Sequence, residues 1–163
     1  MAESQSKSIE KGASESQLVV LRVDREEYGI EIMDVREIVR WQEPTPVPQT
    51  PADVRGVISL RGTVIPVLDL RSRFGSGEPK DTTETRIVVI EVGDAPVGVT
   101  VDEVTEALSV PASAREPVST LFVSEGSELG EVVNLEDRLL LVLDPSKLID
   151  SVTGIVAAVA AAA

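Results

Sequence analysis

Short apolar runs rich in Val, Ile and Leu recur along this chain, each ended by Gly, Pro or charged residues. Runs of this kind are typical of β-strands. They predict strands at residues 18–23, 28–32, 54–60, 63–70, 85–92, 97–101, 106–110, 130–135 and 138–144. The apolar spacing changes to a helical one at residues 33–39, 70–74 and 145–149, which predicts short helical turns there. The chain is therefore expected to be all-β, mainly strands with short helices.

Two blocks of sequence occur twice, in the same order. Residues 18–39 (LVVLRVDREEYGIEIMDVREIV) align without a gap with residues 87–108, and residues 54–70 (VRGVISLRGTVIPVLDL) align with residues 129–145. Identical pairs include Val19/Val88, Val20/Val89, Val23/Val92, Gly29/Gly98, Val35/Val104, Glu37/Glu106, Leu60/Leu135, Val67/Val142, Leu68/Leu143 and Asp69/Asp144. Chance identity between Val-rich strands is the alternative, but two blocks in one order favour a true internal repeat.

The repeat predicts two similar β subdomains. Each would be a small barrel of about five strands, because closure removes exposed strand edges. We expect the first barrel at residues 18–80 and the second at 81–150, with a groove between them where a partner can bind. The polar residues 1–17 predict a disordered lead-in. Residues 151–163 form an Ala-rich tail that is too short for the roughly 20 residues that a membrane span requires.

The composition excludes several classes of function. The chain contains no Cys and no His, so disulfides, thiolate nucleophiles, His-dependent triads and the usual zinc ligands are excluded. A formal net charge of −13 argues against nucleic acid and anionic membranes as partners, because both bind clustered Lys and Arg. No cofactor motif is present: GSG at 75–77 lacks the Lys and Ser/Thr of a phosphate-binding loop.

Two aspartates, Asp69 and Asp144, each end an apolar strand and precede an expected helical turn. Asp is a favoured helix N-cap, and Pro145 stands at the first helical position after Asp144. Capping is therefore the favoured interpretation. The rival is a carboxylate- or metal-dependent hydrolase that uses Asp69, Asp102 or Asp144.

The pair Arg61-Gly62 interrupts the most strand-like stretch of the chain, RGVISLRGTVIPVLDL. It predicts a tight turn between two strands, because Gly tolerates turn geometry that a β-branched residue resists. Glu37, on the expected helical turn at 33–39, is a candidate ion-pair partner for Arg61. In the second half Glu106 matches Glu37, but Glu136 stands in place of Arg61, so we expect the pair in the first barrel only. An arrangement confined to one half favours a partner-binding role over an architectural one.

Four ordered segments, EEYGIEIMDVREIV, TPADVRGVISLRGTVIPVLDLRSRFG, RIVVIEV with VGVTVDEVTEAL, and LGEVVNLEDRLLLVLDPSKLI, resemble the CheW family of chemotaxis coupling proteins. The resemblance covers about residues 17–150. It implies two SH3-like five-stranded β-barrels, no catalytic activity and no cofactor. One departure is Ser59, where the family often has Asn.

The resemblance also implies partners and a place in the cell. The partners would be the cytoplasmic hairpin tip of chemoreceptors and the CheW-like regulatory domain of the histidine kinase CheA. The protein would be cytoplasmic and recruited to membrane-bound receptor arrays. The partner-binding residues that it implies are Val35, Glu37, Ile38, Gly56, Arg61 and Gly62. A scaffold for a non-chemotactic histidine kinase is the alternative within the same family.

Overall fold

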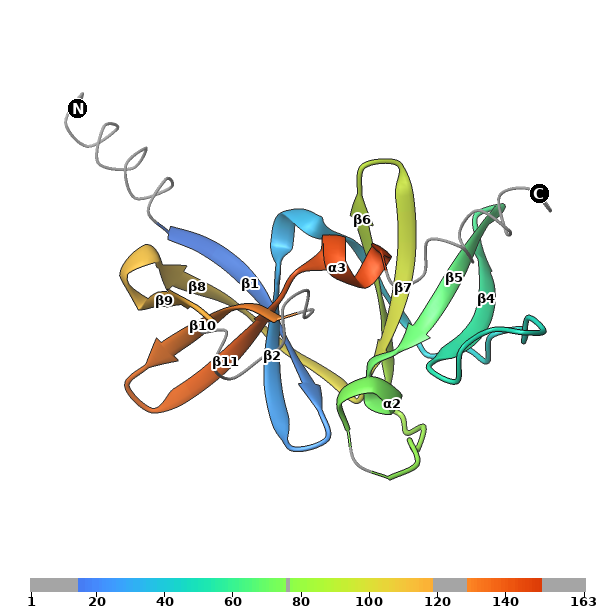
Figure 1. Cartoon of the computed structure of the whole chain (residues 1–163), viewed down its shortest axis with the longest axis horizontal. Helices are drawn as coiled ribbons and strands as arrows, with labels where there is room; N and C mark the ends of the chain where they lie inside the picture. The colour runs from blue at the N-terminus through green and yellow to red at the C-terminus, as the bar shows by residue number, and fades with distance from the viewer. Residues whose placement is uncertain (1–14, 76, 119–128, 151–163) are drawn as a thin grey trace.

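The computed structural model describes residues 15–75, 77–118 and 129–150 (Figure 1). The expected Ala-rich tail at 151–163 lies outside these residues. Of the expected lead-in, only residues 15–17 are described, and they belong to the first strand. No helix among the described residues is long and apolar enough to span a membrane.

The described chain forms two β-sheets that lie side by side (Figure 1). In spatial order the six-stranded sheet contains β8 (Glu103–Pro111), β1 (Glu15–Val23), β2 (Glu26–Glu31), β11 (Arg138–Leu143), β10 (Leu129–Leu135) and β9 (Arg115–Pro117). The five-stranded sheet contains β3 (Val35–Arg40), β6 (Arg86–Val92), β7 (Ala95–Val101), β5 (Thr63–Asp69) and β4 (Val54–Leu60). The helical elements are η1 (Ile32–Asp34), η2 (Ala112–Ala114), α2 (Leu70–Phe74) and α3 (Pro145–Asp150). The all-β prediction with two repeated β units is confirmed, although one sheet has a sixth short strand.

The helical turn predicted at residues 33–39 is wrong for most of its length. Only η1 is helical, and residues 35–40 form the edge strand β3, which pairs antiparallel with β6. Exposure alternates along β3 with a period of two, as a strand requires. The apolar spacing in this segment is too short to separate the two periods, and the hydrogen-bond partners that β6 offers favour the strand.

The two sheets do not coincide with the expected segments 18–80 and 81–150, because each sheet takes strands from both halves of the chain. The repeat is nevertheless exact at the level of strands, since the order β8-β1-β2-β11-β10 matches β3-β6-β7-β5-β4 position by position. Val142 of the second half pairs in parallel with Gly29 of the first, and Val67 of the first half pairs in parallel with Gly98 of the second. Equivalent strands carry similar residues, so the sequence does not reveal which copy a strand pairs with.

Strands β1 and β6 are buried on both faces, which explains why their sequences, LVVL and IVVI, are continuously apolar. On one face of β1, Leu18 and Val20 belong to the core of the six-stranded sheet. The equivalent face of β6 gives Ile87 and Val89 to the core of the five-stranded sheet. The opposite faces meet in a third core, shared by both sheets. Its buried members are Val19, Leu21, Val23, Tyr28, Ile30, Val54, Leu68, Leu70, Val88, Ile90, Val97, Val99, Val101, Leu143 and Leu148.

The repeated glycines Gly29 and Gly98 serve the same close approach in the two sheets. A Cβ added at Gly29 would lie 3.1 Å from Cδ1 of Leu18, and one added at Gly98 would lie 2.9 Å from Cγ2 of Ile87. Leu18 and Ile87 are themselves equivalent in the repeat. The identity of these glycines therefore reflects one packing requirement used twice.

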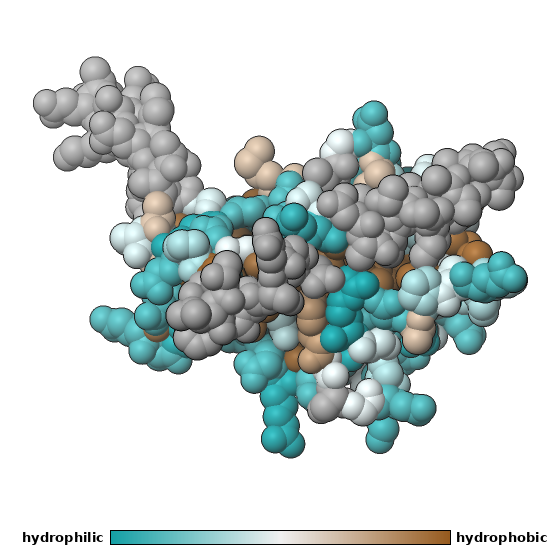
Figure 2. All heavy atoms as spheres, viewed as in Figure 1, coloured by the Kyte–Doolittle hydropathy of each residue, from teal (hydrophilic) through white to brown (hydrophobic). Residues whose placement is uncertain are grey.

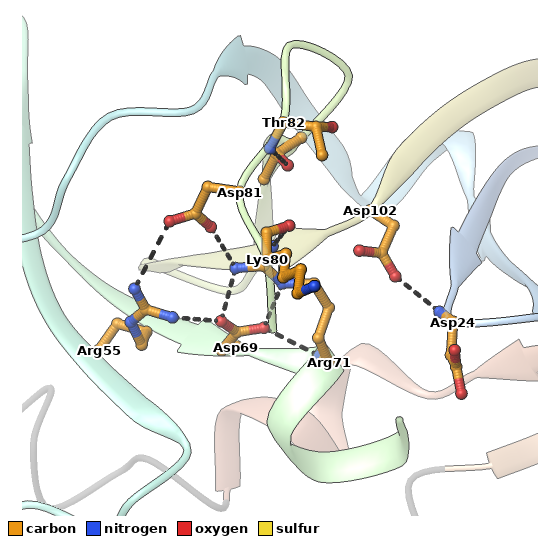
Figure 3. Close-up of polar contacts among 9 residues, drawn as sticks. Asp24, Arg55, Asp69, Arg71, Lys80, Asp81, Thr82 and Asp102 are labelled. Carbon is orange, nitrogen blue, oxygen red and sulfur yellow. Dashed lines mark hydrogen bonds and ion pairs between the residues drawn. The ribbon is translucent and has the colours of Figure 1, made fainter. Parts of the chain in front are cut away.

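Asp69 lies at the centre of a buried ion-pair cluster (Figure 3). Its carboxylate accepts hydrogen bonds from the backbone N–H, Nε and Nη2 of Arg71, each at 2.9 Å, and from Nη1 of Arg55 at 2.9 Å. Arg71 also donates to Asp81 at 2.8 Å. Burial by itself would lower the pKa of Arg71, but its bonds to Asp69 and Asp81 outweigh this and raise the pKa above its usual value.

The capping prediction is confirmed at both aspartates. Asp69 accepts from the backbone N–H of Arg71 at the start of α2, and Asp144 accepts from the backbone N–H of Ser146 at 3.0 Å at the start of α3. The two caps differ in their surroundings, because Asp69 is fully buried between arginines whereas Asp144 is only partly buried.

Gly56 has a structural role that no other residue type can fill. Its φ is +134°, and an added Cβ would lie 2.0 Å from the backbone oxygen of Thr45. Thr45 is bridged to Val57 by two backbone hydrogen bonds of 2.8 and 2.9 Å, which hold the segment before β4 against this strand. The position thus requires both the φ and the absence of a side chain.

We expect Gly56→Ala to lower the free energy of unfolding by about 2 to 4 kcal/mol, because it adds backbone strain and an overlap with main chain. Urea unfolding of the purified variant measures this. Gly62→Ala is the comparison: its φ is +83°, but nothing lies within 4 Å of an added Cβ, so only the strain of about 1 kcal/mol applies. Equal losses in the two variants would contradict the assignment.

The two capping aspartates offer a second test. Asp144→Ala is expected to cost about 1 kcal/mol, the usual value of a lost N-cap. Asp69→Ala loses the same cap and also removes one of the two carboxylates that buried Arg71 pairs with, so we expect a larger loss of about 3 kcal/mol. Thermal and urea unfolding of both variants would separate these values, and similar losses would show that the arginines add nothing.

Candidate partner-binding groove

The Arg61-Gly62 turn has the geometry predicted for it. Leu60 pairs with Thr63, and the two residues between them have φ values of +49° and +83°. Positive φ at both central residues is the type I′ arrangement, which matches the twist of the flanking strands. The turn therefore projects the Arg61 side chain from the end of the β4–β5 hairpin.

Glu37 and Arg61 form the predicted ion pair, with Nη1 of Arg61 lying 2.7 Å from Oε2 of Glu37. The contact is a single hydrogen bond. Glu37 lies on β3 and Arg61 on the β4–β5 turn, so the pair joins the two opposite edges of the five-stranded sheet. The side chain of Arg61 is 78% exposed, so most of its guanidinium faces solvent.

The expectation that this pair occurs in only one half is wrong. In the six-stranded sheet Glu106, the equivalent of Glu37, pairs with Nη1 of Arg138 at 2.9 Å. Arg138 follows the equivalent hairpin turn by one residue and also pairs with Glu27. These hydrogen bonds to Glu27 and Glu106 raise the pKa of Arg138. The sequence alignment missed the second pair because the arginine stands at a shifted position. An ion pair between a glutamate of the edge strand and an arginine in or next to a hairpin turn is present in both sheets.

A shallow apolar pocket of about 400 Å³ lies between the edge strands β3 and β8 of the two sheets. We call it the groove. Its lining residues are Val19, Ile32, Val35, Glu37, Ile38, Val104, Thr105, Glu106 and Ala107. The repeated pairs Val35/Val104 and Glu37/Glu106 thus line a single groove, one member from each wall. The groove lies where the two repeats meet, as the sequence predicted.

The groove combines exposed apolar side chains with neutralised carboxylates. Ile32 and Ile38 are 37% and 41% exposed, and Met33, next to Ile32 on η1, is 93% exposed. The two glutamates that line the groove are each paired with an arginine. Figure 2 shows a face on which hydrophilic and apolar side chains are mixed. Exposed apolar residues that gather at one place, as in the groove, mark candidate binding surfaces.

The predicted site residues divide into three groups. Val35, Glu37 and Ile38 line the groove, and Arg61 joins it through Glu37. Gly56 and Gly62 do not line it, since the former makes a close backbone contact and the latter completes a turn. The residues of β8 were missed, although the identities Val35/Val104 and Glu37/Glu106 already pointed to that strand.

The three carboxylates of the rival hydrolase hypothesis do not converge on one site. Asp69 and Asp144 cap helices, and Asp102 accepts a hydrogen bond of 2.6 Å from the backbone N–H of Asp24 (Figure 3). Within the described ranges, no three acidic side chains are grouped in a way that would hold a metal ion. The arrangement favours structural bonding at all three positions.

Known proteins share both the sequence and the fold. A family model described as the CheW-like domain matches residues 17–153. The chain is 37% identical over 134 residues to the chemotaxis protein CheW of Bacillus subtilis, covering 82% of this chain and 86% of the relative. It is 32% identical over 136 residues to the chemotaxis protein CheW of Klebsiella aerogenes, covering 83% and 82%.

A solved structure agrees with this assignment. The scaffolding protein TtCheW from Thermoanaerobacter tengcongensis superimposes with a TM-score of 0.73 at 30% identity, and the match covers 78% of this chain and 88% of that one. The matches in sequence and in fold span the same two repeated sheets. This chain belongs to the CheW-like domain family.

Proposed function

We propose that this protein is a non-enzymatic adaptor that couples chemoreceptors to the histidine kinase CheA in chemotaxis signalling. The single observation that carries the proposal is the groove: an apolar surface between the edge strands of two sheets, with its carboxylates already paired. Such a surface suits the docking of a protein segment and offers no catalytic group. Membership of a family whose relatives are named chemotaxis proteins supports the same conclusion.

The cytoplasmic hairpin tip of a receptor is the partner that we assign to the groove. A helix presents a stripe of apolar side chains, and such a stripe fits an apolar groove. Ile38 and Ile32 would lose the 41% and 37% of their surface that is exposed, so each would contribute less than half of the roughly 1.5 to 3 kcal/mol that full burial is worth. Arg61, with most of its guanidinium in solvent, is available to an acidic or carbonyl group at the rim. Recruitment to membrane-bound receptor arrays follows from this contact.

The CheW-like regulatory domain of CheA is the second partner, and it requires a separate surface. The likeness to the family implies that this surface lies at the barrel ends. The decisive experiment measures binding of a receptor cytoplasmic fragment and of the CheA regulatory domain, separately and together. Adaptor function requires that both bind and that a ternary complex forms. Binding of neither partner, or mutually exclusive binding, would refute the proposal.

We expect Ile38→Asp to weaken binding of the receptor fragment at least about tenfold, because a carboxylate would replace an apolar contact in the groove. Titration calorimetry measures the affinity. Leu139→Asp is the matched control: Leu139 is 57% exposed and lies on β11, away from the groove. The same loss in both variants would mean that added charge, not the groove, weakens binding.

The Glu37–Arg61 pair allows a test of its two roles. We expect Arg61→Glu and Glu37→Arg each to weaken partner binding while changing the free energy of unfolding by only about 0 to 1 kcal/mol, because the pair is exposed. Thermal unfolding and calorimetry are measured on the same samples. If the double variant with exchanged charges regains binding, the ion pair itself matters; if both single variants unfold, the role in partner binding is refuted.

A further inference from the structure

A second pocket, of about 430 Å³, lies at the far end of β3. Its lining residues are Arg40, Trp41, Thr82, Thr83, Thr85 and Arg86. Arg40 and Arg86 are directly opposite each other on the antiparallel strands β3 and β6. Two cations therefore share one face of the sheet, with Cβ atoms about 5 Å apart.

This pocket continues the face of β3 that forms the groove. Ile38 lines the groove, and Arg40 follows it by two residues, so both side chains leave the strand on the same face about 7 Å apart. Their partners on β6 are Val88, a member of the shared core, and Arg86. The apolar groove thus ends at a pair of arginines.

The protein neutralises the arginines only in small part, since the pKa of Glu84 is lowered mainly by its hydrogen bonds from Thr82 and Thr83 and least by the charge of Arg86. Among the described residues, neither guanidinium forms an ion pair with a carboxylate. Nη1 of Arg86 donates to the backbone oxygens of Thr83 and Thr85, at 2.8 and 2.9 Å, which fixes the position of the guanidinium and leaves its other N–H groups available. The neighbouring Glu84 instead accepts hydrogen bonds of 3.1 Å from the hydroxyls of Thr82 and Thr83.

Like charges placed directly opposite each other destabilise a sheet, so this pair costs free energy in the unbound protein. A carboxylate placed between the arginines would remove that cost and form charge-assisted hydrogen bonds. The chain as a whole has a net charge of −13, so an isolated cationic site is a local exception to its surface. Its complement is an acidic group.

The other wall of the groove has no counterpart to this site. In the internal repeat, Arg40 corresponds to Ser109 and Arg86 corresponds to Gln17. These two residues are also paired opposite each other, on β8 and β1, but neither is charged. The two walls of the groove therefore carry the same residue types at their centre, and they differ where Arg40 and Arg86 stand opposite each other.

We propose that Arg40 and Arg86 form a carboxylate-binding subsite that receives an acidic side chain of the receptor segment docked in the groove. This inference rests on the proposed function, and it adds the orientation in which the receptor segment docks in the groove. A groove with two equivalent walls would accept a segment in two opposite orientations. The arginine pair selects the orientation that places an acidic residue beside β3 and β6.

The test measures binding of a receptor cytoplasmic fragment to the full chain and to Arg40→Glu and Arg86→Glu, by calorimetry at low and high salt. We expect each variant to bind about 5- to 10-fold more weakly at low salt, with a smaller loss at high salt. Lys147→Glu is the control with the same charge change, at an exposed residue of α3, and it should bind within about twofold of the unchanged chain.

The thermal unfolding temperature distinguishes a role of the two arginines in binding from a purely structural role. Arg40→Glu places a carboxylate opposite Arg86, so we expect its thermal unfolding temperature to be equal to or higher than that of the unchanged chain while its binding is weaker. Replacing the acidic residues of the receptor fragment by Lys, one at a time, should restore binding to Arg40→Glu at a single position.

The outcomes separate the two proposals. If the unchanged chain does not bind the fragment, the receptor-coupling function fails and the subsite fails with it. If the unchanged chain binds but Arg40→Glu and Arg86→Glu behave like Lys147→Glu, the subsite alone is refuted. The subsite would also be refuted if Arg40→Glu had a lower unfolding temperature and Lys147→Glu lost binding to the same extent as Arg40→Glu.

Discussion

The packing of the two sheets against each other in the shared core is the interaction on which the rest of this structure depends. Strands β1 and β6 each lie next to the edge strand of their own sheet and are buried on both faces. Fifteen buried residues from both sheets make up the shared core, so neither sheet has a complete apolar interior without the other. The exchange of strands between the two halves adds to this, because each sheet needs residues from both ends of the chain.

The position of the groove follows from the same packing. Its walls, β3 and β8, are edge strands paired to β6 and β1 respectively. Because β1 and β6 both give buried side chains to the shared core, that core positions the two walls relative to each other. The ion pairs Glu37–Arg61 and Glu106–Arg138 neutralise the two glutamates of the walls. The groove is therefore a preformed surface, which lowers the cost of docking for the partner that we propose.

Local chemistry could be predicted from the sequence, and pairing between distant segments could not. The Arg61-Gly62 turn and the Asp69 and Asp144 caps depend on a few adjacent residues, and all three were predicted correctly. The strand β3 was mistaken for a helical turn because its strand character depends on β6. The partner of Glu106 was missed because Arg138 sits one residue past the turn. The repeat revealed which strands are equivalent, but equivalence cannot decide between pairing within a half and pairing across halves.

The pseudo-symmetry of the fold makes the two walls of the groove nearly alike. Two walls built from the same repeat present Val35 opposite Val104 and Glu37 opposite Glu106, so the apolar centre of the groove carries little information about direction. Direction must come from positions where the repeat has diverged. Arg61 keeps an exposed guanidinium whereas Arg138 divides its bonds between two glutamates, and Arg40 with Arg86 stands where the other wall has Ser109 with Gln17. Both differences place the available positive charge on the side of the five-stranded sheet. In the docking that we propose, the residues that the repeat has kept provide the apolar contact, and the residues at which it has diverged provide the orientation of the partner.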